Sequence, residues 1–153
     1  MKRQLLAFMA MILNAVPYVS AQYADCVDPR IGSGDHGHVF IGANVPWGMV
    51  NVGPVQPYHG WDWCSGYHVS GDSIIGFAHT HLSGTGCSDL GDITLMPIYG
   101  YARTESREDF INDIASRYTH EKEVVEPGYY SVLLDKWSIK AEMTATDRTA
   151  IHK

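Results

Sequence analysis

Charged residues are scarce in this sequence, and those present are mostly acidic. Lysine and arginine together number 11, aspartate and glutamate 17, which leaves a formal charge of −6. No polybasic run occurs anywhere in the chain. A protein that binds duplex nucleic acid needs a basic face to release the counterions of the phosphates. We therefore expect no nucleic-acid partner.

The sequence also lacks an apolar run long enough to cross a membrane, which takes about 20 residues. Its longest apolar run covers residues 5–16, follows the basic pair Lys2 and Arg3, and leads to small residues at and before Ala21. These three parts are typical of a secretory signal peptide. They predict a cleaved leader over residues 1–21 and no membrane span. We expect an exported protein that is periplasmic, held at the cell surface or secreted in a bacterium.

Cysteine is sparse, with three residues at Cys26, Cys64 and Cys87. An odd number allows at most one internal disulfide in an oxidising compartment, and the spacing matches no zinc motif. The sequence therefore excludes a disulfide scaffold and a zinc finger. It leaves the disulfide state of the three thiols open.

Regular helical periodicity is missing from residues 22–153, the part expected to form the mature domain. Fourteen of the 15 glycines lie between Gly32 and Gly100, among short apolar pieces that are typical of short strands and shaped loops. Residues 109–117 are expected to form a short helix or an irregular connection. Since 45% of the chain is hydrophobic, it can bury a core as one domain. We expect that domain to be mainly β.

The clearest strand pattern lies near the C-terminus. Residues 129–135 and 137–146 read as two strands joined tightly at residues 135–136, and apolar and polar residues alternate along the second strand. The pattern predicts an antiparallel hairpin with one wet face, as part of an antiparallel β-sandwich. Because the sequence stops at Lys153 directly after a strand, we expect the domain to be incomplete at its C-terminal end.

Histidine is concentrated in the glycine-rich half, where six of the eight lie between His36 and His81. His79 and His81 would face the same way on a strand, and His36 and His38 form a second such pair beside a carboxylate. Together the two pairs could make a metal site of the His/Asp type. The same pattern fits histidines that hydrogen-bond to backbone in a core. The metal ligands therefore stay unassigned.

Residues 60–68 form an aromatic cluster that contains Trp61 and Trp63, with Asp62 and Cys64 among them. Aromatic faces stack on sugar rings, and carboxylate and imidazole groups bind sugar hydroxyls. The segment therefore predicts a sugar-binding pocket. A buried pair of tryptophans that leaves Asp62 outside fits the same residues.

Hydrolysis of a glycosidic bond needs two carboxyl groups, one as acid and one as base or nucleophile. The aspartates near the aromatic cluster are Asp62, Asp72, Asp89 and Asp92. None has a context that distinguishes it from the others. The acidic run at residues 121–126 is expected to be a solvated strand edge or loop. No catalytic residue is assigned.

Several long motifs occur in the order found in one enzyme family. They are Val27–Gly34, His36–His38, Gly42–Val50, Gly60–His68, Ile75–Gly86, Leu90–Ile93, Met96-Pro97, Tyr118–Tyr130 and Met143–Arg148. Together they cover essentially all of the mature chain. In these motifs the sequence resembles the N-terminal domain of glycoside hydrolase family 92.

The resemblance implies an exo-acting, calcium-dependent, inverting α-mannosidase that acts on α-mannosides of N-glycans or mannans. It implies an N-terminal β-sandwich domain followed by an (α/α)₆ barrel, with the active site between the two. The chain resembles only the first part of that sandwich. The catalytic acid and base and the calcium ligands are therefore expected in the missing barrel, and the fragment alone is expected to be inactive.

The resemblance also implies that this part of the enzyme supplies one wall of the mannose pocket. The residues expected there are Trp47, Gly48, Asp62, Trp63, Cys64, His79 and His81. Two other readings stay open. The chain could be a free-standing carbohydrate-binding module that uses Trp61 and Trp63, or a small metal-dependent hydrolase or dioxygenase built on His79 and His81.

Overall fold

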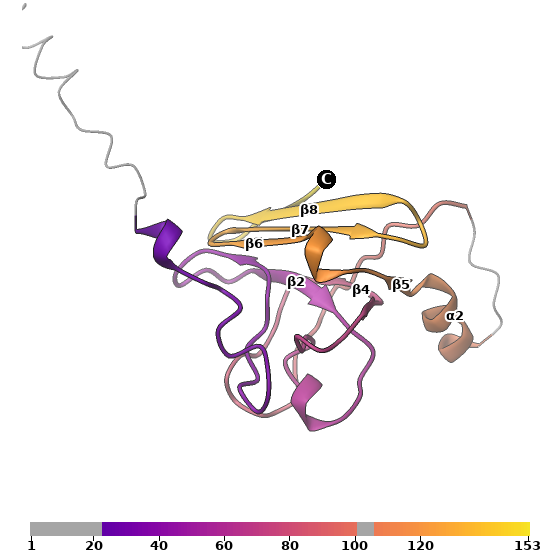
Figure 1. Ribbon diagram of the computed structural model, residues 1–153, viewed down its shortest axis with the longest axis horizontal. Helices are drawn as coiled ribbons and strands as arrows, with labels where there is room; N and C mark the ends of the chain where they lie inside the picture. The colour runs from indigo at the N-terminus through magenta and orange to yellow at the C-terminus, as the bar shows by residue number, and fades with distance from the viewer. Residues whose placement is uncertain (1–22, 101–105) are drawn as a thin grey trace, which may run out of the picture.

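A computed structural model describes residues 23–100 and 106–153 of the chain, so the predicted signal peptide over residues 1–21 lies outside the described residues. Within these ranges the chain forms antiparallel strands in three small sheets, one α-helix and three 3₁₀ turns. The two main sheets stack in layers, and long loops extend from the lower layer on the far side from β7 and β8 (Figure 1). The fold is mainly β, as predicted.

The larger sheet has the strand order β6-β7-β8-β9. Its strands are β6 (Glu123–Glu126), β7 (Tyr129–Leu134), β8 (Ile139–Ala145) and β9 (Ala150–His152). Strands β7 and β8 pair antiparallel from Tyr129 opposite Thr144 to Leu134 opposite Ile139, which confirms the predicted hairpin. The turn between them is longer than predicted, because Ser138 adopts a φ of 53° and breaks the extended backbone before β8.

The side chains of β8 alternate between the core and the solvent. Ala141, Met143 and Ala145 are buried, whereas Lys140 and Thr144 are exposed. This is the pattern predicted from the sequence for a half-buried antiparallel strand. The apolar face of the sheet therefore points into the molecule.

The second layer is a three-stranded sheet with the order β1-β2-β4, and a separate two-stranded ladder joins β3 to β5. Their bounds are β1 (Ala43–Asn44), β2 (Asn51–Val55), β4 (Gly76–Ala78), β3 (Ser73–Ile74) and β5 (Ser116–Arg117). Val52 and Phe77 of this layer share one core with Tyr130, Val132 and Met143 of the larger sheet. The two antiparallel sheets thus pack face to face, as a sandwich requires.

Two glycines let the chain before β1 cross β2 at close range. A Cβ atom on Gly42 would lie 2.1 Å from the carbonyl oxygen of Val52, and one on Gly53 would lie 2.1 Å from that of Ile41. Neither position has room for a side chain. The crossing holds residues 41–42 against β2.

The acidic run at residues 121–126 differs in part from the prediction of a solvated strand edge or loop. The side chain of Glu123 is fully buried, and its carboxylate accepts hydrogen bonds from Tyr130 Oη at 2.7 Å and Tyr67 Oη at 3.1 Å. His120 Nδ1 lies 2.8 Å from the same carboxylate. The prediction holds for the exposed Glu121 and Glu126 and for β6 as an edge strand. It is wrong for Glu123, because hydroxyl donors from distant segments satisfy this charge inside the core.

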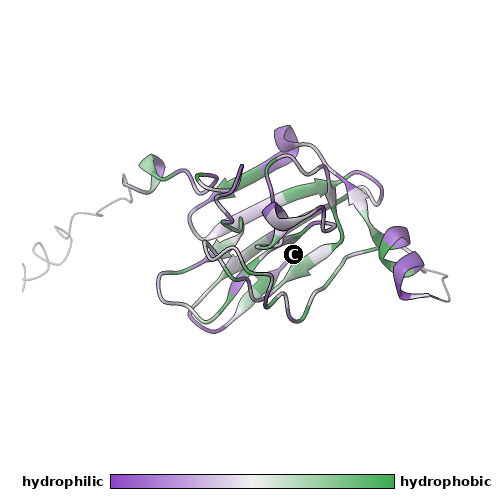
Figure 2. Cartoon of the chain, turned by 90° about the horizontal axis from the view of Figure 1, so that it is seen from below, coloured by the Kyte–Doolittle hydropathy of each residue, from purple (hydrophilic) through white to green (hydrophobic). Residues whose placement is uncertain are grey.

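The only α-helix in the described ranges, α2, spans Arg107–Ile114 and is mostly hydrophilic (Figure 2). It begins before the predicted segment at residues 109–117 because Ser106 Oγ accepts a hydrogen bond from the backbone N–H of Asp109 at 3.1 Å. The 3₁₀ turns are η1 (Ala24–Cys26), η2 (Trp61–Trp63) and η3 (His120–Lys122). Within residues 23–100 and 106–153, no helix has the length and apolarity needed to cross a membrane.

Candidate functional site

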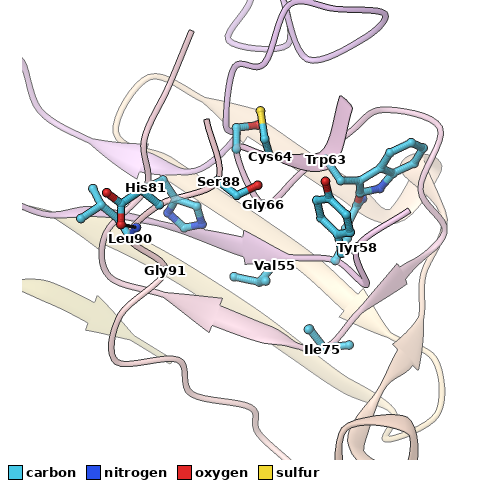
Figure 3. Close-up of a pocket in the computed structure, with 13 residues that line it drawn as sticks. Val55, Tyr58, Trp63, Cys64, Gly66, Ile75, His81, Ser88, Leu90 and Gly91 are labelled. Carbon is cyan, nitrogen blue, oxygen red and sulfur yellow. Dashed lines mark hydrogen bonds between the residues drawn. The ribbon is translucent and has the colours of Figure 1, made fainter. Parts of the chain in front are cut away.

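A hollow of about 430 Å³ lies between the segment at residues 56–66, which contains η2, and the loop at residues 88–91. Three residues predicted for the sugar pocket line it: Trp63, Cys64 and His81. Figure 3 shows Tyr58 beside Trp63 at one end and Leu90 beside His81 at the other. The sequence did not single out Tyr58, because the residue lies outside the aromatic segment at residues 60–68.

His81 is a buried residue of the lining of this hollow. Its Nδ1 donates a hydrogen bond to the carbonyl oxygen of Asn51 at 2.8 Å, and its ring stacks on Phe40 at 5.0 Å. Its Nε2 is buried without a hydrogen-bond partner in the described part of the chain. Burial lowers the pKa of His81, which favours the neutral ring.

Trp63 and Cys64 form the side of the hollow made by η2. The Trp63 ring lies between His68, at 4.4 Å, and His59, at 5.3 Å. Cys64 is 6% exposed, and burial raises the pKa of its thiol. A thiol of that kind is a weak nucleophile, so Cys64 contributes shape and apolar surface to the hollow.

The two tryptophans of the aromatic cluster do not form the buried pair that a strand would give. Residues 61–63 turn as a 3₁₀ helix, which directs Trp61 and Trp63 to different neighbours. Trp61 is 55% exposed and lies over His38, with ring centroids 4.2 Å apart. The tryptophans therefore do not form one flat platform either.

Asp62 lies outside the hollow lining and forms a separate cluster with two histidines. Its Oδ1 is 2.6 Å from His36 Nδ1 and 3.5 Å from His38 Nε2. The hydrogen bond between them raises the pKa of His36 and lowers the pKa of Asp62. These three residues are a group of donors that could hold a metal ion.

Of the two alternatives for the histidine pairs, His79 and His81 follow the one in which histidines hydrogen-bond to backbone, and they do not join His36 and His38 in one metal site. His79 Nδ1 donates to the carbonyl oxygen of Ile93 at 2.7 Å, and its Nε2 lies 3.1 Å from His152 Nε2 on β9. His79 and His81 are thus each held by a different backbone carbonyl. Within the described residues neither belongs to a group of three metal-binding side chains.

Trp47 and Gly48 form a turn after β1 and do not line the hollow. The backbone N–H of Gly48 donates to the carbonyl oxygen of Val45, and that of Met49 donates to Asp147. Trp47 has a φ of 64° and is 99% exposed. The turn is therefore fixed by its backbone, while the indole has no packing of its own.

Residues 26–153 match the family model described as the glycosyl hydrolase family 92 N-terminal domain. The chain belongs to glycoside hydrolase family 92. The match covers nearly all of the described residues and confirms the resemblance carried by the sequence motifs. A similar curated protein is an uncharacterized secreted glycosidase of Arthroderma benhamiae, 32% identical over an alignment 149 residues long that covers 90% of this chain and 18% of that protein.

Solved structures extend the likeness of this family 92 domain. The α-mannosidase BT3965 from Bacteroides thetaiotaomicron, in complex with mannoimidazole, is 37% identical, with a TM-score of 0.76 over 84% of this chain and 17% of that one. The family 92 enzyme ccman5 is 27% identical, with a TM-score of 0.70 over 86% of this chain and 18% of that one. The chain thus spans less than a fifth of the length of these relatives, at their N-terminal end.

Proposed function

We propose that this family 92 domain is the N-terminal part of an exported, exo-acting, calcium-dependent, inverting α-mannosidase that acts on N-glycans or mannans. In this proposal residues 1–21 are a cleaved signal peptide. Residues 22–153 are the first part of the β-sandwich, which contributes one wall of the mannose pocket, and an (α/α)₆ barrel follows. The likeness to α-mannosidase BT3965 supports the substrate class.

The hollow beside η2 is the observation that carries the proposal. Its volume of about 430 Å³ falls in the range of small-ligand sites. The aromatic rings of Tyr58 and Trp63 offer apolar faces to the C–H groups of a sugar, and the exposed carboxylate of Asp89 offers an acceptor to a hydroxyl. A wall with these features binds a sugar without reacting with it.

The described residues that line the hollow do not supply an inverting pair of carboxyl groups. Inversion needs an acid and a base about 6.5–9.5 Å apart, on opposite sides of the sugar. Asp89 is the only carboxylate among these described lining residues. We therefore assign the acid and the base to the barrel.

The residues around the hollow do not fit calcium either. Calcium takes six to eight oxygen ligands, usually several carboxylates and carbonyls. Asp89 would be a single carboxylate beside an imidazole and a thiol, which is the wrong donor set. The calcium ligands therefore belong with the barrel in this proposal, and the chain's own share is sugar binding.

Release of mannose from a panel of α-mannobioses tests the proposal. We expect calcium-dependent release by a longer polypeptide in which this chain continues into the barrel, and no release by residues 22–153 alone. In the longer protein Asp89→Ala should lower kcat/KM about tenfold, the value of one hydrogen bond. His59→Ala is the matched control, since His59 is exposed and does not line the hollow. Release by residues 22–153 alone would contradict the placement of the catalytic pair.

A second candidate is a free-standing carbohydrate-binding module. The exposure of Trp61 and of Tyr58, 55% and 65%, favours it, because solvent-facing aromatic rings are typical of sugar-binding surfaces. Tight binding of mannan by residues 22–153, lost in Trp61→Ala, would support this function. This binding would decide for the module if the longer forms of the protein also failed to release mannose.

A further inference from the structure

We infer that His36, His38 and Asp62 form a binding site for one divalent transition-metal ion, with Zn²⁺ as the best match. Two imidazole nitrogens and a carboxylate oxygen of these residues lie within 4.8 Å of one another. The inference is independent of the mannosidase proposal, because it uses neither the hollow nor calcium.

The distances within the cluster suit an ion held by all three side chains. Zinc binds nitrogen and oxygen ligands at about 2.0–2.2 Å, so neighbouring ligands of a tetrahedral ion lie about 3.3–3.5 Å apart. His38 Nε2 is already 3.5 Å from Asp62 Oδ1. His36 Nδ1 is closer, at 2.6 Å, but its side chain is 73% exposed and can move outward by the small amount required.

His38 is the residue that points to a ligand. Its side chain is only 6% exposed, and its Nε2 has no hydrogen-bond partner among the described residues. A buried polar atom without a partner costs stability unless something binds it. Because this nitrogen faces the carboxylate of Asp62, an ion between the two would satisfy both groups.

The surrounding loops hold the cluster in place. The backbone N–H of Gly84 donates to the carbonyl oxygen of His38 at 2.7 Å. Trp61 Nε1 donates to the carbonyl oxygen of Gly86 at 2.7 Å, which keeps the indole 4.2 Å from the His38 ring and 5.3 Å from that of His36. The ligands are therefore positioned before any ion arrives, which favours binding.

The donor set selects the ion. Imidazole nitrogen suits Zn²⁺, Ni²⁺ and Cu²⁺, whereas Ca²⁺ requires a shell of oxygen ligands. Asp62 is 30% exposed and His36 lies at the surface, so a fourth position remains open to water. We expect Zn²⁺ to bind in a 1:1 ratio and a large excess of Ca²⁺ not to displace it.

Titration calorimetry with ZnCl₂ tests the inference on the untagged chain. We expect one Zn²⁺ per chain, and an association constant at least about tenfold lower in both His36→Ala and His38→Gln. Fluorescence gives a second readout, because a Cu²⁺ ion at the site would quench Trp61. That quenching should be largely lost in Trp61→Phe.

The controls separate this site from unspecific binding to histidine. His59→Ala is the matched control, because the ring of His59 lies 5.3 Å from that of Trp63 and His59 is not part of the cluster. This variant should bind Zn²⁺ like the unchanged chain. Circular dichroism reports folding, and the exposed position of His36 keeps the test valid if His38→Gln unfolds. Equal affinity in the unchanged chain and His36→Ala would overturn the inference, as would loss of binding only in His79→Ala.

Discussion

At the scale of single residues, buried polar groups of this domain fall into two kinds. Glu123 is fully satisfied by donors that meet it in the core. His38 and His81 each keep a buried ring nitrogen without a partner in the described residues. Because most buried polar atoms in folded proteins are paired, and the His38 nitrogen lies in a cluster of metal-binding side chains, it is the one that points to a bound ion.

Replacement of Glu123 tests whether a buried charge with all its hydrogen-bond partners stabilises the fold. Glu123→Ala leaves the hydroxyls of Tyr67 and Tyr130 without their acceptor in the core, and each such loss costs about 1–3 kcal/mol. We expect the free energy of unfolding to fall by about 3 kcal/mol in urea denaturation followed by tryptophan fluorescence. Glu121→Ala, at an exposed position of the same run, should change it by less than about 0.5 kcal/mol. Similar losses in the two variants would show that the buried network does not stabilise the fold.

At the scale of elements, the sequence predicts those features of the fold that depend on residues close together in the chain. The alternation at residues 137–146 is local, and β8 follows it. The contact of His36 with Asp62 joins residues 26 positions apart, and Glu123 meets Tyr67 across 56 positions. No local pattern encodes these meetings, because they depend on how η2 and the loops pack on the sheets. The family motifs pointed to the region of the hollow. They did not show which residues line the hollow and which belong to the cluster around Asp62.

The crossing of residues 41–42 over β2 gives a prediction for an element. Gly53→Ala would place a Cβ 2.1 Å from the carbonyl oxygen of Ile41, so the backbone segments must separate. We expect the variant to lose about 2–3 kcal/mol of stability, within the range for overpacking. Gly34→Ala is the matched control, because its Cβ would meet only a methyl group of Val69 at 3.0 Å. Thermal denaturation of the two variants compares them, and equal melting temperatures would contradict the close crossing.

At the scale of the whole molecule, one loop connects the two candidate sites. Gly84 and Gly86 bind the backbone of His38 and the indole of Trp61, and Ser88 to Gly91 line the hollow. Residues 84–91 thus run from the metal cluster to the sugar hollow.

The stability of the whole domain should fall as the solution is acidified. Burial lowers the pKa of His81 and of His152 in the folded chain, whereas both histidines titrate near pH 6.5 when the chain is unfolded. Below about pH 6.5 the unfolded chain binds more protons at these sites than the folded one, so protonation favours unfolding. The raised pKa of the exposed His36 acts in the opposite direction.

Thermal denaturation at about pH 7.5 and about pH 5.5, on either side of the unfolded pKa, measures this loss. In His81→Asn the fall in melting temperature between the two conditions should be smaller, because the amide keeps a donor for the Asn51 carbonyl but does not titrate. His59→Asn removes an exposed histidine and should leave the fall unchanged. An unchanged fall in His81→Asn would mean that the His81 ring has the same pKa in the folded and the unfolded chain. Its burial would then not be a cause of the loss of stability in acid.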